Sequence, residues 1–164
     1  MLKVTSVSRS FGDHLVLDDV SFAVEPGRMT GFLGANGSGK TTTMRIILGV
    51  LAAHGGTVTW QGKPVSSRQQ FGYMPEERGL YPKMKVAEQI TWLGQLHGLS
   101  HADARRNCAQ LLDQLELSDR ADSKLEELSL GNQQRAQIAA ALVHDPEMLI
   151  LDEPFSGLDP LAVD

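Results

Sequence analysis

The residues whose types and spacing carry the clearest chemistry form a glycine-rich stretch, Gly34-Ala35-Asn36-Gly37-Ser38-Gly39-Lys40-Thr41. It fits the pattern G-x-x-x-x-G-K-[ST], which predicts a loop that holds phosphates. Glycines let the backbone turn sharply and approach a ligand, and successive N–H groups then form a nest for an anion. We expect Lys40 to reach the β- and γ-phosphates and the Thr41 hydroxyl to bind Mg²⁺. The alternative is a glycine-rich surface turn.

Two elements must position this loop. The short apolar run Met29–Leu33 predicts a buried strand before it. After it, residues 41–51 predict a helix, because four apolar residues fall on one helical face: Met44, Ile47, Leu48 and Leu51. The N-terminus of that helix would point at the phosphates and favour their charge.

A second motif, Met148-Leu149-Ile150-Leu151-Asp152-Glu153, places two acids directly after an apolar run. Such a run predicts a buried parallel strand, and open α/β sheets hold their ligands at the carboxyl ends of such strands. Asp152 is our choice for a contact with Mg²⁺ made through water, and Glu153 would orient or deprotonate the attacking water. Adjacent residues of a strand point to opposite faces, so the acids can have separate roles. The alternative is a solvated acidic turn.

A third motif runs from Leu128 to Arg135 and precedes a predicted helix that reaches about Val143. Ser129 is a natural N-cap, and Gly131 allows close approach of the backbone. A helix that starts in this way offers a second anion site, although an ordinary helix cap explains the same residues.

The composition changes along the chain. Residues 1–75 predict strands and turns around one helix, 85–146 predict helices, and 147–164 return to a strand and a loop. We therefore predict an α/β core of residues 1–84 and 147–164 with a helical subdomain inserted at 85–146. Ser100 is the expected N-cap of a helix to about Glu116, with Cys108 on its apolar stripe.

The overall composition restricts the partners. The chain has 164 residues, a formal net charge of −5 and 41% hydrophobic residues. This balance gives no general attraction for nucleic acid, so an anionic ligand must be held by local geometry. The single cysteine has no partner for an internal disulfide, no apolar segment is long enough to span a bilayer, and the start lacks a signal peptide. These features favour a cytosolic protein, or one attached to a membrane through a partner.

Taken in order, the three motifs and the segment Pro154-Phe155-Ser156-Gly157-Leu158-Asp159-Pro160 resemble the nucleotide-binding subunit of an ATP-binding-cassette (ABC) transporter. The resemblance covers essentially the whole chain. It implies an α/β fold: a P-loop NTPase core with a mainly parallel sheet, an N-terminal antiparallel β region and an inserted helical subdomain.

The resemblance also implies roles for particular residues. ATP and Mg²⁺ would bind at Gly34, Asn36, Gly37, Ser38, Gly39, Lys40, Thr41 and Thr42. Asp152 would be the Walker B acid that binds the metal, and Glu153 the catalytic carboxylate, acting with Lys40. The signature segment would comprise Ser129 to Gln133, with Gly131, and Ser156–Asp159 would form the D-loop. Phe11 matches the aromatic residue that stacks on adenine; it fits a core or strand-end aromatic as well.

Two positions depart from the family pattern. Leu130 replaces a glycine of the signature, and leucine adopts positive φ less easily, which predicts altered loop geometry or looser phosphate contact. Glu76 occupies the position of the Q-loop glutamine; it can bind Mg²⁺, but it would repel the γ-phosphate. A surface acid is the alternative for Glu76. The segments 76–82 and 128–134 are similar to a branch of bacterial export-type subunits.

The resemblance implies transport driven by ATP hydrolysis. Two such subunits would face each other head to tail, identical or different, and a membrane-spanning permease would hold them at the inner face of the cell membrane. No nucleic acid is expected, because basic clusters are lacking. Rival interpretations are a soluble ATPase of the same superfamily, a small-molecule kinase and a nucleotide-binding regulator without hydrolysis.

The switch histidine of the family is expected beyond Glu153, and all five histidines of this sequence precede that residue. On this ground the sequence resembles an N-terminal part of a longer subunit, which would bind nucleotide but turn over slowly or not at all.

Overall fold

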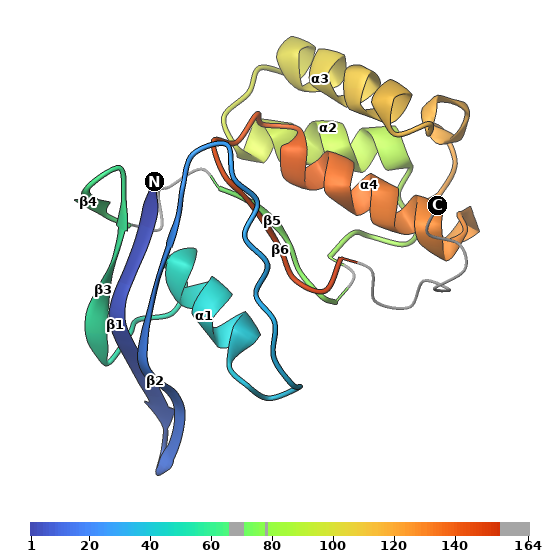
Figure 1. Ribbon diagram of the computed structural model, residues 1–164. Coiled ribbons are helices and arrows are strands. Elements are labelled where there is room, and N and C mark those ends of the chain that lie inside the picture. Colours follow the sequence, from blue (N-terminus) through green and yellow to red (C-terminus); the bar gives the residue numbers. More distant parts are fainter. Residues whose placement is uncertain (66–70, 78, 155–164) are drawn as a thin grey trace. The chain divides into compact units, whose positions relative to one another are not determined.

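The computed structural model of this chain describes residues 1–65, 71–77 and 79–154. The chain divides into two compact units, residues 1–69 and 70–164, and each is described by itself (Figure 1). The D-loop predicted at Ser156–Asp159 lies outside the described residues.

The first unit is built on a four-stranded antiparallel sheet in the order β2-β1-β3-β4. The strands are β1 (Leu2–Phe11), β2 (His14–Val24), β3 (Gly55–Trp60) and β4 (Lys63–Pro64). Alternate residues of β1, Leu2 and Val4, are buried, as expected for one covered face. The register then shifts between Val4 and Val7, so Val7 returns to the buried side. This sheet is the N-terminal antiparallel region that the sequence predicts.

Helix α1 (Lys40–Ile47) follows the glycine-rich loop and buries Thr43, Ile46 and Ile47. It is shorter than the predicted helix of residues 41–51. The chain leaves the helix at Gly49, whose φ of 70° is left-handed, and the N–H of Gly49 donates to the Ile46 carbonyl. This pattern is a common way for a helix to end.

The strand predicted at Met29–Leu33 is not formed. The segment has no ladder partner among the described residues, and Met29 and Leu33 are 99% and 97% exposed. A strand needs a neighbour to bond its N–H and C=O groups, which an apolar run alone does not supply. The segment is instead anchored by Phe32, whose ring packs on that of Phe22 in β2 with centroids 5.1 Å apart.

The second unit combines a parallel strand pair with helices. Strands β5 (Gly72–Met74) and β6 (Leu149–Leu151) pair residue for residue, from Gly72 opposite Leu149 to Met74 opposite Leu151. This pair supplies the predicted parallel sheet within the described residues, and the apolar run at 149–151 is a strand as expected.

Three helices accompany the pair: α2 (Val86–Leu96), α3 (His101–Gln114) and α4 (Leu130–Leu142). Two 3₁₀ turns, η1 (Ser118–Arg120) and η2 (Leu125–Glu127), connect α3 to α4. The predicted N-cap of α3 is confirmed, because the Ser100 Oγ accepts from the Asp103 N–H at 3.1 Å. The Ser100 hydroxyl and Arg106 also hold the pKa of the Asp103 carboxyl below its usual value.

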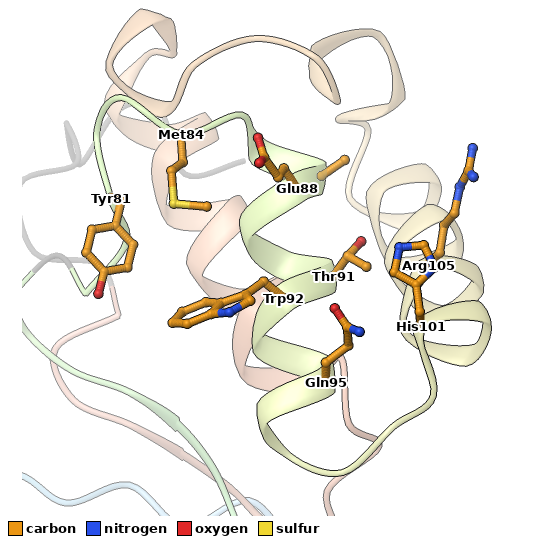
Figure 2. A pocket seen from close by; sticks show the side chains of 9 residues that line it. Tyr81, Met84, Glu88, Thr91, Trp92, Gln95, His101 and Arg105 are labelled. Carbon is orange, nitrogen blue, oxygen red and sulfur yellow. The ribbon is translucent and has the colours of Figure 1, made fainter.

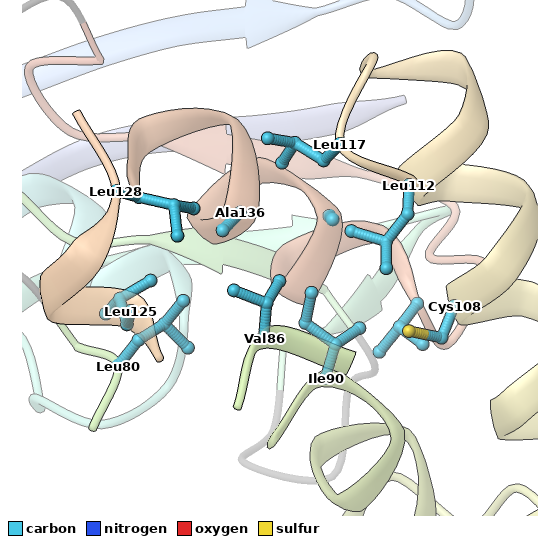
Figure 3. Packing of buried hydrophobic residues seen from close by; sticks show 11 residues of the cluster. Leu80, Val86, Ile90, Cys108, Leu112, Leu117, Leu125, Leu128 and Ala136 are labelled. Atoms are coloured by element: carbon cyan, nitrogen blue, oxygen red, sulfur yellow. The ribbon is translucent and has the colours of Figure 1, made fainter. Parts of the chain in front are cut away.

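The three helices enclose one apolar core (Figure 3). Cys108 is 2% exposed in it, as the apolar stripe predicts, and burial raises the pKa of its thiol. The core consists of buried residues from α2, α3, α4, the segment before α2 and the segments that flank the other helices: Leu80, Val86, Ile90, Cys108, Leu112, Leu117, Leu125, Leu128, Ala136, Ala139 and Val143. Within the described ranges, none of the helices has the length and apolar character needed to cross a membrane.

Candidate functional site

The glycine-rich loop forms a tight cradle at the start of α1. Gly37 and Gly39 adopt left-handed φ angles of 81° and 88°, and the Ser38 N–H donates to the Ala35 carbonyl at 3.1 Å. A Cβ added to Gly39 would lie 2.5 Å from the Leu17 Cδ2 and 3.1 Å from the Val16 carbonyl oxygen. The loop therefore packs directly against β2, and only glycine fits its last position.

Lys40 folds back over this cradle. Its Nζ donates to the Gly34 carbonyl at 2.9 Å and lies 3.3 Å from the Ala35 carbonyl, so the ammonium links the start of the loop to the start of α1. Thr43 holds the base of the loop, because its buried Oγ1 donates to the Gly39 carbonyl at 2.9 Å. Thr41 and Thr42, in the first turn of α1, are half-buried.

The N-terminus of α1 is suited to an anion. Its N-cap, Gly39, supplies no side-chain cap, and the first turn has no acidic residue. The first N–H groups of a helix lack intrahelical partners, and the helix dipole adds positive potential there. Asn36, Gly37 and Ser38 lie exposed beside this end. The cradle therefore has the shape and charge of a phosphate site.

Phe11 ends β1 at the hairpin with β2, opposite His14. Its ring is 49% exposed, which excludes the core interpretation and leaves an aromatic face open for stacking. The Arg9 guanidinium covers part of the ring, with its Cζ 4.9 Å from the centroid. The sequence pattern had not singled out Arg9.

The acids of the second motif lie at the carboxyl end of the β5–β6 pair. The Asp152 N–H donates to the Met74 carbonyl at 2.9 Å, so the ladder carries Asp152 to the edge of the sheet. Asp152 is 1% exposed, whereas Glu153 is exposed and has a left-handed φ of 52°. The two neighbouring side chains thus have different environments. Glu76 follows β5 by two residues, is exposed, and belongs to the same edge.

Both carboxylate oxygens of Asp152 are buried without a hydrogen-bond partner among the described residues. A buried charge without a partner is costly, and a bound cation removes that cost. No group of three His, Cys, Asp or Glu side chains able to hold a metal occurs in the described part of the chain. Asp152 therefore fits a metal whose remaining ligands are waters, hydroxyls or phosphate oxygens.

Ser129 caps α4, accepting from the Asn132 N–H at 3.3 Å. Leu130 is the first residue of α4 and is absent from the residues with positive φ, so the geometric conflict predicted for it does not arise. Helical φ suits leucine as well as glycine. Gly131 lies in the first turn, and Gln133 donates from its Nε2 to the Leu128 carbonyl at 2.9 Å, which fixes the segment before the helix.

The structure also shows a pocket that the motifs did not indicate, with a volume of about 620 Å³. As Figure 2 shows, it lies between α2, the start of α3 and the segment before α2. Tyr81 and Trp92 line it with an edge-to-face contact at 6.3 Å. The buried amide of Gln89 fixes the backbone at Tyr81, since its Oε1 accepts from the Tyr81 N–H at 3.0 Å. No sequence signal marked Gln89, because its role depends on the fold of the preceding segment.

Two histidines meet at the ends of α2 and α4. The rings of His97 and His144 stack with centroids 3.9 Å apart and planes 13° from parallel. Burial, and then the neighbouring His97, hold the pKa of His144 below its usual value. The chain turns between α2 and α3 at Gly98, whose φ of 94° is left-handed.

The predicted site residues divide between the two units. Gly34 to Thr42 and Phe11 belong to the first unit, and Glu76, Ser129 to Gln133, Asp152 and Glu153 to the second. A phosphate-binding loop before a helix, and a parallel strand pair that ends in acids, define an α/β protein of the P-loop nucleotide-binding class.

Residues 17–156 match the family described as "ABC transporter", and the chain belongs to this family. An "uncharacterized ABC transporter ATP-binding protein", YhaQ of Bacillus subtilis, is 46% identical over 166 residues, covering 100% of this chain and 56% of the relative. "Nod factor export ATP-binding protein I" of Cupriavidus metallidurans is 38% identical and covers 99% of this chain and 55% of the relative. The chain thus spans little more than half the length of these relatives.

Solved structures agree with this result. The "structure of ATP binding subunit of ABC transporter" has a TM-score of 0.84 at 34% identity, covering 99% of this chain and 70% of that one. The cbiO1 protein of Clostridium perfringens, described as part of the ABC transporter complex cbiONQ, has a TM-score of 0.86 at 27% identity, covering 98% and 68%. The predicted α/β fold class with a phosphate-binding loop is confirmed.

Proposed function

We propose that the protein containing this chain binds and hydrolyses ATP to power a membrane transporter. The cradle of Gly34–Gly39, closed by Lys40 at the uncapped start of α1, is the observation that carries this proposal. Its backbone N–H groups would bind the β- and γ-phosphates, and Lys40 would exchange its carbonyl contacts for phosphate oxygens. The exposed ring of Phe11 would stack on the adenine.

We further propose that Thr41 and Asp152 hold the Mg²⁺ of the same nucleotide. The unpartnered carboxylate of Asp152 supports this pairing, because Mg²⁺ in nucleotide sites is usually bound through one or two carboxylates together with waters and phosphate oxygens. Bound Mg²⁺ would neutralise phosphate charge as the γ-phosphoryl group is transferred. Glu76, at the same edge of the β5–β6 pair, is a further candidate ligand.

Glu153 is the proposed catalytic carboxylate. It is exposed beside a buried Asp152, so it can contact solvent while its neighbour holds the metal. It would accept a hydrogen bond from the attacking water, orient it toward the γ-phosphate and take its proton.

Ser129, Gly131 and Gln133 are proposed to contact the γ-phosphate of a nucleotide held by a second subunit. The start of α4 is exposed at Ser129 and Leu130, and its first turn has no acid. A helix N-terminus of this kind suits an anion brought by a partner. Two subunits would then close head to tail over two ATP molecules and open after hydrolysis.

We propose that the pocket beside Trp92 receives a cytoplasmic segment of the permease, which would hold the ATPase at the inner face of the membrane. The exposed rings of Tyr81 and Trp92 offer apolar contact area, and Glu88 and Arg105 offer charges of both signs around it. This combination of aromatic anchors and a polar rim is typical of protein interfaces. Export is the proposed direction, supported by relatives whose names include Nod factor export.

Phosphate release by the full-length protein tests the function. Glu153→Gln should lower turnover about 10²- to 10⁴-fold while ATP binding persists, and Lys40→Ala should weaken ATP binding itself. The exposed acid Glu126 gives a matched control, because Glu126→Gln removes the same charge from η2. A regulator without hydrolysis would show no turnover in the wild type and no effect of Glu153→Gln. A soluble ATPase would hydrolyse ATP but not co-purify with a permease.

A further inference from the structure

Arg9 makes two contacts that join different parts of the first unit. Its guanidinium Cζ lies 4.9 Å from the centroid of the Phe11 ring, within the range of a cation–π interaction. Its Nη1 donates to the Ala52 carbonyl at 2.9 Å. One arginine therefore connects the exposed ring at the end of β1 with the segment that follows α1.

Neighbouring residues strengthen this connection. The His54 N–H donates to the Ser8 carbonyl at 2.9 Å, and the Ser10 N–H donates to the His54 Nδ1 at 3.4 Å. Three consecutive residues of β1, Ser8 to Ser10, thus bind residues 52–54. Since α1 ends at Ile47, these contacts connect the end of β1 to the segment that follows the helix, five residues beyond its last residue.

The start of α1 packs against the same hairpin of β1 and β2. Gly39 packs against Val16 and Leu17 of β2, and Leu17 lies opposite Arg9 in the register of β1 and β2. Leu17 is three residues from His14, which pairs with Phe11, a span of about 10 Å along a strand. The Phe11 ring and the phosphate cradle are therefore both held by the β1–β2 hairpin.

We propose that Arg9 is a positioning residue for the nucleotide base. It covers one face of the Phe11 ring and, held by the Ala52 carbonyl, fixes the ring so that a purine stacks on the opposite face. This inference rests on the proposed binding of ATP at the cradle with its base on Phe11. Arg9 itself contacts neither base nor phosphate.

A fixed ring raises affinity because less side-chain freedom is lost when the base binds. Exposed cation–π contacts of this kind correspond to roughly a two- to fivefold change in an equilibrium constant. The effect should appear only for ligands that carry a base. A ligand with the phosphates alone should bind the cradle equally well with or without Arg9.

Calorimetric titration of the full-length protein with a non-hydrolysable ATP analogue and, separately, with inorganic tripolyphosphate tests the proposal. Arg9→Gln keeps a neutral donor for the Ala52 carbonyl but loses the cation, and Arg9→Ala loses both. We expect each variant to bind the ATP analogue about two- to fivefold more weakly, with tripolyphosphate affinity unchanged. Arg28→Ala is the control for charge, because Arg28 is an exposed arginine of the same unit.

The Phe11→Ala variant separates the proposed stacking of the base on Phe11 from the proposed positioning of that ring by Arg9. If Phe11→Ala weakens the ATP analogue and Arg9→Gln adds nothing in that background, Arg9 acts through the ring, as proposed. If Phe11→Ala leaves nucleotide affinity intact, the base does not stack there, and both assignments fall. If Phe11→Ala weakens binding and Arg9→Gln does not, the role of Arg9 alone is wrong. Equal losses for the ATP analogue and tripolyphosphate would show a charge effect and overturn the proposal.

Discussion

Replacement of Gly39 by alanine should be the most damaging single-methyl change in the cradle. Gly39 has a φ of 88°, and a left-handed conformation costs an L-residue about 1–2 kcal/mol. The added Cβ would also lie 2.5 Å from the Leu17 Cδ2 and 3.1 Å from the Val16 carbonyl oxygen. Overpacking of this kind costs about 1–3 kcal/mol, so we expect Gly39→Ala to destabilise the protein by about 2–5 kcal/mol in total.

Gly37 is a matched control in the same loop. Its φ is 81°, but an added Cβ would meet nothing within 4 Å. Gly37→Ala should therefore show the backbone cost alone, about 1–2 kcal/mol. Gly31 has neither a positive φ nor a near neighbour for a Cβ, so Gly31→Ala should change stability by less than about 0.5 kcal/mol.

The free energy of unfolding, from urea denaturation of the three variants and the wild type, gives the comparison. Calorimetric titration with Mg·ATP should rank the three variants in the same order of affinity loss, because the added methyl group distorts the cradle. Equal stability of Gly39→Ala and Gly37→Ala would refute the steric argument, since both would then carry only the backbone cost.

Two further predictions concern the second unit. Ile90 is fully buried among the helices, so Ile90→Ala should cost about 2–5 kcal/mol, whereas Leu96→Ala, at a 62% exposed position of α2, should change urea stability by less than about 0.5 kcal/mol. Burial and the stacked His97 lower the pKa of His144 more than the Phe71 backbone and Asp145 raise it, so the fold favours the neutral ring. The unfolded chain therefore takes up this proton first, and stability should be lost as pH falls from about 6.5 toward the folded pKa. Urea titrations at several pH values should show this slope, at most about 1.4 kcal/mol per pH unit, and His144→Phe should reduce it; an unchanged slope would contradict the assignment.

The sequence predicted the elements that depend on local chemistry. The pattern of Gly34 to Thr41 identified a loop before a helix, and the Ser100 and Ser129 caps set the starts of α3 and α4. Each of these signals acts within a few residues of the chain: glycines let the loop backbone turn, and the Ser100 and Ser129 side chains bond N–H groups three residues on. The acids at 152 and 153 were likewise placed at the end of a strand, because an apolar run fixes where that strand stops.

Features that depend on distant contacts could not be predicted in this way. The run Met29–Leu33 has strand composition, but a ladder partner is a property of the fold and not of the run. Arg9 acts through the carbonyl of Ala52, 43 positions away, and Gln89 bonds the Tyr81 N–H and the Met84 carbonyl of the irregular segment before α2. No motif marks either residue. Leu130 looked unfavourable only because the family pattern has glycine there; as the first residue of a helix it carries no strain.

The proposed function depends on one metal–nucleotide complex that both the cradle and Asp152 would hold. Electron paramagnetic resonance of Mn²⁺, used in place of Mg²⁺ with ATP and the full-length protein, measures this directly. Asp152→Asn should weaken Mn²⁺ binding in the presence of ATP by about 10- to 100-fold while ATP still binds at Lys40, and Asp113→Asn, at an exposed acid of α3, should not. Wild-type binding of Mn²⁺ with ATP by the Asp152→Asn variant would contradict the account.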